Sequence, residues 1–250
     1  MAENASSKLP PVIKKIAGTP PLGLLGAFTD NGRYHGLNTH GTDQYFGNVN
    51  LGQERQALLF GRRGSWNRTD VISWSINDNG EATVFADFHG LANVGGGLLP
   101  EPVTLIAKAE VNPQDEEDVL LSKLRIQQRI PKTPELLKSF KAAYNAMDEQ
   151  GIAHLFAEQA QFQGTAEKEY RQVLRQNVAE YFQNIAESRQ SQTLKIEAFD
   201  TIDDELIVHA VFESVAKDGT KNDDKPVQFT IRHEEVDGVQ QILEFRSEPR

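Results

Sequence analysis

Residues 28–36, Phe-Thr-Asp-Asn-Gly-Arg-Tyr-His-Gly, decide the fold, because a second version of them stands at residues 156–164 as Phe-Ala-Glu-Gln-Ala-Gln-Phe-Gln-Gly. Three more blocks recur in the same order. Residues 81–88 match 205–212, residues 102–108 match 226–232, and residues 123–126 match 244–247. One match of this length is weak evidence, but four in a constant order predict two copies of a whole domain.

Composition restricts the classes of function. The chain has 250 residues, a formal net charge of −10 and no cysteine. This length accommodates two domains that can each bury a core. Nucleic acid and anionic membranes are bound by basic patches, so the acidic balance favours neither as a partner. The lack of cysteine excludes disulfides, thiol catalysis and thiolate metal sites.

The N-terminal sequence Met-Ala-Glu-Asn-Ala-Ser-Ser-Lys has no apolar segment like that of a signal peptide. No apolar run in the chain is long enough to span a membrane. We therefore expect a soluble cytoplasmic protein.

Proline pairs and hydrophobic periodicity predict the organisation of the chain. Residues 1–20 are expected to form a flexible tail, because the proline pairs at 10–11 and 20–21 break helices. The first domain is expected over residues 21–130 and the second over 133–250. Helices are predicted over 50–63, 134–150, 152–159 and 166–188. Strands are predicted over 71–76, 82–89, 102–110, 119–129, 193–199, 205–215, 226–235 and 239–247.

The phenylalanine–glycine motif, followed by a long helix and a strand meander that ends in Leu-Arg or Phe-Arg, resembles the NTF2-like (SnoaL-like) superfamily. The resemblance covers residues 130–250 well and 25–130 less well. It implies an α+β fold of two tandem cones, each a curved antiparallel sheet wrapped around helices. The first copy has a reduced first helix, for which the proline-rich tail could supply a remnant. Members include enzymes, ligand carriers and adaptors, so the fold does not fix the function.

Strand alternation argues against the acid–imidazole pair Asp87 and His89 as catalytic groups. Val84, Ala86 and Phe88 form the apolar set of their strand. Side chains alternate between the two faces of a strand. If the apolar set points into the cone, Asp87 and His89 point out of it.

The resemblance implies that any catalytic base and donor lie inside the cone. Candidate catalytic residues are Tyr34, which shares the phase of Phe28, and the loop residues His40 and Asp43. Structural packing is the simpler interpretation of Tyr34. Residues expected to line a ligand site are Tyr34, Trp74, Phe88, Phe162 and His233. Trp74 is expected to share one strand face with Ile72 and Ile76. No spacing of His, Asp and Glu indicates a metal site, and we expect no cofactor.

Two functional hypotheses follow. The scarcity of inward polar residues favours a non-catalytic binding protein whose tandem domains hold an apolar small molecule or a protein partner. The alternative is a cofactor-independent lyase or isomerase of the dehydratase, cyclase or ketosteroid isomerase type, acting in one cone. Convergent ionisable groups in a pocket would favour the enzyme, and an apolar or filled pocket would favour binding.

The resemblance also implies that sheets of this fold pair face to face, and two copies in one chain could form that pair internally. Phe85 and Val211 are apolar residues in the outward phase of corresponding strands. We predict a monomeric chain in light scattering, with Phe85→Asp destabilising both domains together because it buries a charge. A stable dimer that buries both residues between two chains would contradict this prediction.

Overall fold

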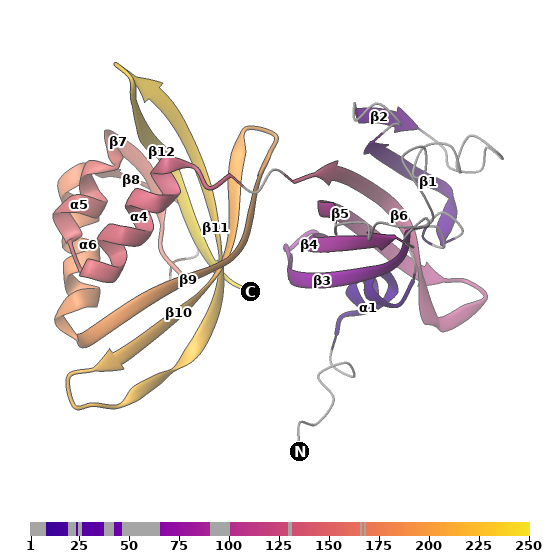
Figure 1. Ribbon diagram of the computed structural model, residues 1–250, viewed down its shortest axis with the longest axis horizontal. Coiled ribbons are helices and arrows are strands. Elements are labelled where there is room, and N and C mark those ends of the chain that lie inside the picture. Colours follow the sequence, from indigo (N-terminus) through magenta and orange to yellow (C-terminus); the bar gives the residue numbers. More distant parts are fainter. Residues whose placement is uncertain are drawn as a thin grey trace, which may run out of the picture. The chain divides into compact units, whose positions relative to one another are not determined.

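The computed structural model describes residues 9–19, 24, 27–37, 43–46, 66–90, 101–129, 132–165, 167 and 169–250. The chain divides into two compact units, Met1–Ile130 (unit 1) and Pro131–Arg250 (unit 2) (Figure 1). Each unit has its own hydrophobic core. The helix predicted over 50–63 and the candidate His40 lie outside the described residues.

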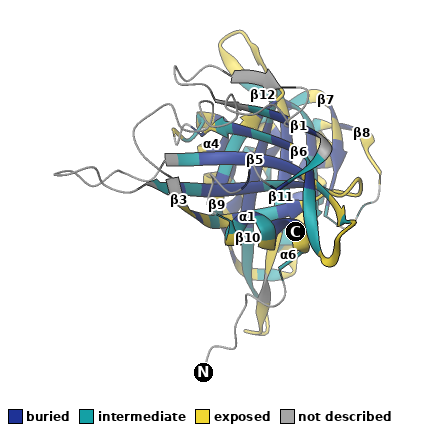
Figure 2. Ribbon diagram, turned by 90° about the vertical axis from the view of Figure 1, so that its right-hand side faces the viewer, coloured by how far each residue is buried: buried dark blue, intermediate teal, exposed yellow. Residues whose placement is uncertain are grey.

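Unit 1 contains one helix of eight residues, α1 (Pro11–Gly18), and a sheet of six strands within the described residues. The strands are β1 (Phe28–Leu37), β2 (Asp43–Phe46), β3 (Trp66–Ile76), β4 (Glu81–Gly90), β5 (Glu101–Asn112) and β6 (Asp115–Gln128). Their order across the sheet is β2-β1-β6-β5-β4-β3. The middle of β5 is buried (Figure 2).

Unit 2 repeats this order as β8-β7-β12-β11-β10-β9 and adds helices. The helices are α4 (Glu135–Ala146), α5 (Glu149–His154) and α6 (Arg175–Glu187), and all three lie on one side of the sheet (Figure 1). The strands are β7 (Phe156–Gln163), β8 (Arg171–Leu174), β9 (Arg189–Ile202), β10 (Glu205–Ala216), β11 (Lys221–Val236) and β12 (Val239–Pro249).

The two sheets share one register, which confirms the α+β fold with two tandem cone domains. Corresponding Cα partners are Phe28 with Leu121 and Tyr34 with Leu124 in unit 1, and Phe156 with Ile242 and Phe162 with Phe245 in unit 2. Each copy has a register shift between its two pairs. The backbone N–H of Leu121 donates to Ala27, and that of Ile242 donates to Leu155, both at 2.7 Å. The sheets are mixed, because β1 and β7 run parallel to their partners β6 and β12.

Helix α1 corrects the expectation of a flexible tail for residues 11–18. Pro11 occupies the first position of the helix, where its missing N–H costs nothing and its fixed φ suits the helix. Val12, Ile13 and Ile16 are buried in the core of unit 1. Helix α1 packs chiefly on β3, as the twelve-residue α4 packs on β9. The tail therefore supplies the reduced first helix of the first copy.

Two helix predictions in unit 2 were partly wrong. Residues 152–159 were expected to be helical, but α5 ends at His154 and Phe156 begins β7. Residues 166–188 were expected to form one helix, but 171–174 form β8 and α6 begins at Arg175. Alanine, glutamate and glutamine give these segments good helix propensity. Pairing of β7 with both β8 and β12 overrides that propensity.

A bulge in β3 also changes one expected strand face. Val71 pairs with Ala86 and Ser73 with Phe85, so Ile72 is the extra residue. Val71 and Trp74 pack on the core, whereas Ile72 is 42% exposed. Ile72 and Trp74 therefore do not share a face.

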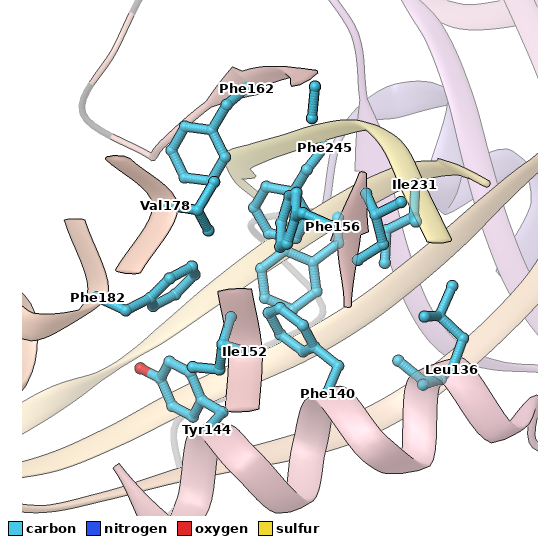
Figure 3. Close-up of a cluster of buried hydrophobic side chains, with 14 of the residues drawn as sticks. Leu136, Phe140, Tyr144, Ile152, Phe156, Phe162, Val178, Phe182, Ile231 and Phe245 are labelled. Carbon is cyan, nitrogen blue, oxygen red and sulfur yellow. The ribbon is translucent and has the colours of Figure 1, made fainter. Parts of the chain in front are cut away.

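The cone of unit 2 is filled by its own aromatic side chains (Figure 3). The buried rings are Phe140, Tyr144, Phe156, Phe162, Phe182, Phe229 and Phe245. Phe140 has ring-centroid distances of 5.8 Å to Phe229 and 5.6 Å to Phe245, and Phe162 lies 5.4 Å from Phe245. Rings at these distances attract one another beyond the effect of burial alone.

The role of α1 predicts the effect of shortening one of its buried side chains. Ile13→Ala should lower the free energy of unfolding by about 2–5 kcal/mol, because it removes buried methyl groups and leaves a cavity. Urea unfolding of the full chain measures this change. Lys14→Ala, at an exposed position of the same helix, should change it by less than about 0.5 kcal/mol. Equal, small effects of the two substitutions would show that α1 does not belong to the core.

Candidate functional site

Asp87 and His89 lie on the sheet face opposite the core of unit 1, as their strand phase predicts. Ala82, Val84, Ala86 and Phe88 belong to the core cluster. The Asp87 carboxylate lies 3.4 Å from the Arg129 guanidinium, and His89 Nε2 lies 3.0 Å from Asp70. These contacts engage both residues on the outer face, so they form no acid–base pair inside the cone.

Tyr34 lies inside the cone of unit 1. Its side chain is 2% exposed and belongs to the core cluster. Its ring meets Phe28 edge to face, with 6.4 Å between centroids. Trp74 and Phe88 pack in the same cluster. Three of the predicted ligand-lining residues therefore share one interior, and Asp43 lies in β2, the edge strand beside β1.

The predicted site residues of unit 2 do not converge. Phe162 is 1% exposed and lies in the aromatic core. His233 follows a register shift in β11, pairs with Ile242 and is half-buried outside the core cluster. No site therefore joins these two residues.

Sequence analysis missed a buried polar group of unit 2, the hydroxyl of Tyr144. The guanidinium of Arg189 donates to this hydroxyl at 3.0 Å and to Gln192 Oε1 at 3.0 Å. Gln192 Nε2 donates to the carbonyl oxygen of Tyr144 at 2.7 Å. Burial raises the pKa of Tyr144, and Arg189 opposes that shift. These hydrogen bonds join α4 to β9, so the Tyr144 hydroxyl has a structural role.

The motif ends in a glycine, Gly164, at a position where Tyr181 leaves no room for a side chain. A Cβ atom at Gly164 would stand closer to the Tyr181 hydroxyl oxygen than non-bonded atoms approach. The Tyr181 ring packs edge to face on Phe162, with 4.8 Å between centroids. The glycine of the repeat thus has a packing role in unit 2.

A cavity of about 380 Å³ lies on unit 2 between β7, β8 and β12; we call it the outer groove. Its lining residues are Gln159, Ala160, Gln161, Tyr170, Arg171, Gln172, Leu243 and Glu244. Six of these eight side chains are polar. Partial burial raises the pKa of Tyr170, while the guanidinium of Arg246, 6.0 Å from the ring centroid, acts in the opposite direction. Sequence analysis missed this site because its residues come from three separate segments.

Comparisons with known proteins find solved structures of low sequence identity to this chain. No protein-family model matches the chain, and no curated protein is significantly similar to it. A solved structure of a putative calcium/calmodulin-dependent protein kinase II association domain from Xanthomonas campestris is 21% identical, with a TM-score of 0.41, over 48% of this chain and 91% of that chain. A hypothetical protein with a ketosteroid isomerase-like fold from Catenulispora acidiphila, in complex with trimethylamine, is 16% identical, with a TM-score of 0.40. The match covers 46% of this chain and 85% of that chain. An epoxide hydrolase of the LEH-like type from Mycobacterium tuberculosis is 11% identical, with a TM-score of 0.37. The match covers 46% of this chain and 80% of that chain.

The strand order that the two sheets share bears out the two-copy arrangement that the NTF2-like resemblance implied. These structures include an enzyme and proteins of undefined role, and each aligns with about half of this chain. Among the described residues, no helix is long and apolar enough to cross a membrane, and no group of three His, Asp or Glu side chains is placed to hold a metal ion.

His209, on β10, gives the structure a titratable group that sequence analysis did not single out. It is fully buried, occupies the repeat position of Phe85 and lies 3.1 Å from Gln228 Oε1. Burial, which is the largest cause, and the charge of Arg250 lower the pKa of His209 to about 3. The imidazole is therefore neutral in the folded protein at neutral pH.

This shift predicts a loss of stability in mild acid. The unfolded chain binds a proton at His209 below pH 6.5, whereas the folded chain does so only near pH 3, so stability falls across that window. Because of His209, the free energy of unfolding should be about 2 kcal/mol smaller at pH 5 than at neutral pH. Urea unfolding at both pH values measures the loss. The His209→Gln variant should lose correspondingly less; an unchanged loss would contradict the assignment.

Proposed function

We propose that the chain is a non-catalytic binding protein that uses the outer surface of unit 2 instead of the interior of its cone. The observation that supports this proposal is the filled cone, in which Phe140, Phe229 and Phe245 contact one another. A cone that bound a ligand would need room where these rings stand.

The arrangement of polar groups supports the same proposal. General acid–base catalysis requires a base and a donor that reach one substrate. In unit 2 the inward hydroxyl of Tyr144 is held by Arg189. In unit 1 the acidic and imidazole groups of Asp87 and His89 lie on the outer face.

A second candidate function is supported by Tyr34. Its ring meets Phe28 edge to face and shares one core cluster with Trp74 and Phe88, and a tyrosine in such a core could bind an apolar ligand or donate a proton to a substrate. A cofactor-independent lyase or isomerase in unit 1 is therefore the alternative.

An activity panel separates the two functions. The full chain is mixed with a β,γ-unsaturated ketosteroid, an aliphatic epoxide or a β-hydroxyacyl thioester, and turnover is followed by absorbance or chromatography. We expect no rate above that of buffer, for the chain and for Tyr34→Phe alike. Turnover that falls by about 100-fold in Tyr34→Phe would establish the enzyme and refute the binding proposal.

A further inference from the structure

The outer groove is crossed by a continuous row of polar side chains. Gln172 on β8 pairs with Gln161 on β7, Gln161 pairs with Glu244 on β12, and Glu244 pairs with Arg232 on β11. Directly paired residues on neighbouring strands project from the same face of a sheet. The row therefore presents two amides, a carboxylate and a guanidinium side by side on the face opposite the core.

The amides of the groove can act as donors and acceptors at once. Gln172 Nε2 donates to Gln159 Oε1 at 3.0 Å. A glutamine amide has two N–H donors and an oxygen that accepts two bonds, so this contact uses only part of each amide. The side chains of Gln159, Gln161 and Gln172 are exposed. Hydroxyl groups, which both donate and accept, match this surface better than a group that only donates or only accepts.

Tyr170 supplies an aromatic wall beside the amides. Its side chain is 39% exposed, and the Arg246 guanidinium lies 6.0 Å from its ring centroid. A tyrosine ring offers a rigid apolar face for C–H groups and a hydroxyl at its rim. An aromatic face next to convergent amides suits a ligand that has an apolar ring face and polar edges.

The charges around the groove compensate one another. Arg171 pairs with Glu167 at 2.7 Å, and Arg232 pairs with Glu244 at 3.0 Å. Arg246 lies 3.3 Å from Glu248. A charged ligand would have to compete with these pairs, whereas a neutral ligand can bind without separating them.

We propose that the outer groove binds a neutral, hydroxyl-rich molecule of one or two sugar rings. This inference rests on the proposed function and gives it a ligand class. The cavity volume of about 380 Å³ is at the lower end of the range for small-molecule sites, which fits one or two rings. The amides and Glu244 bind the hydroxyls, and Tyr170 covers the C–H face.

The test is a titration of the full ¹⁵N-labelled chain with D-glucose, D-galactose, maltose and cellobiose, each up to tens of millimolar. At least one sugar should shift the amide signals of residues 159–161 and 170–172 in a saturable manner. Gln161→Leu and Tyr170→Ala should each weaken that binding roughly three- to tenfold, because each removes one contact. D-Glucosamine and D-glucuronate should bind no more tightly than glucose.

The matched control is Gln183→Leu, which changes an exposed amide on α6 outside the groove and should leave sugar binding unchanged. The proposal is overturned if none of the four sugars shifts the groove signals. It is also overturned if the two groove variants bind like the control, or if glucuronate or glucosamine binds more tightly than every neutral sugar. A negative sugar titration would overturn the ligand class and would not change the result of the activity panel. Turnover in the activity panel would refute the non-catalytic function and would not change the result of the sugar titration.

Discussion

Each copy of the fold depends on the parallel pairing between its first long strand and its last strand. In unit 2 this pairing joins β7 to β12, with Phe162 opposite Phe245 and their rings stacked at 5.4 Å. Parallel strands cannot be joined by a tight turn, so the intervening chain must leave the strand and return. That path carries β8, α6 and the meander β9–β11. The pairing holds the first and last strands of the unit together, while α4 and α5 precede β7 in the sequence.

The same pairing decides which side chains fill the cone. A strand shows alternate residues to its two faces, so once β7 and β12 are in register at Phe162 and Phe245, these two rings point inward together. Phe156, which lies beyond the register shift, also belongs to this core. Helix α4 adds Phe140 and Tyr144 from the other side. The interior is thereby occupied by the chain itself. The alternate positions, Gln161 and Glu244 among them, are left for the outer face, where a polar ligand can be recognised.

The sequence predicted the parts of the fold that depend on repetition and alternation. The four matching blocks predicted two copies, and the apolar set Val84, Ala86 and Phe88 predicted the inward face of β4. It did not predict β7 as a strand, because the alanine and glutamine residues there have helix propensity and the decisive pairing is with distant β12. The bulge at Ile72 was also not predicted, because strand alternation assumes an unbroken register.

Candidate sites were harder to predict than the fold. The position of Tyr34 in the core of unit 1 follows from strand phase, but the outer groove joins the consecutive strands β7 and β8 to the distant strand β12. Tyr170 and Glu244 have no sequence pattern that links them. Only the cross-strand register brings them to one place. The buried Tyr144 hydroxyl was missed for the same reason, because its partner Arg189 begins a different element.

The central claim is that the cone of unit 2 is closed to ligands because its own side chains fill it. The most direct measurement records the methyl NMR signals of Ile152, Val178 and Ile231, which belong to that core, as the full chain is saturated with benzene. Dry apolar cavities of sufficient size take up benzene. A filled cone predicts that these signals do not shift. A saturable shift of all three would show an open cone and contradict the account.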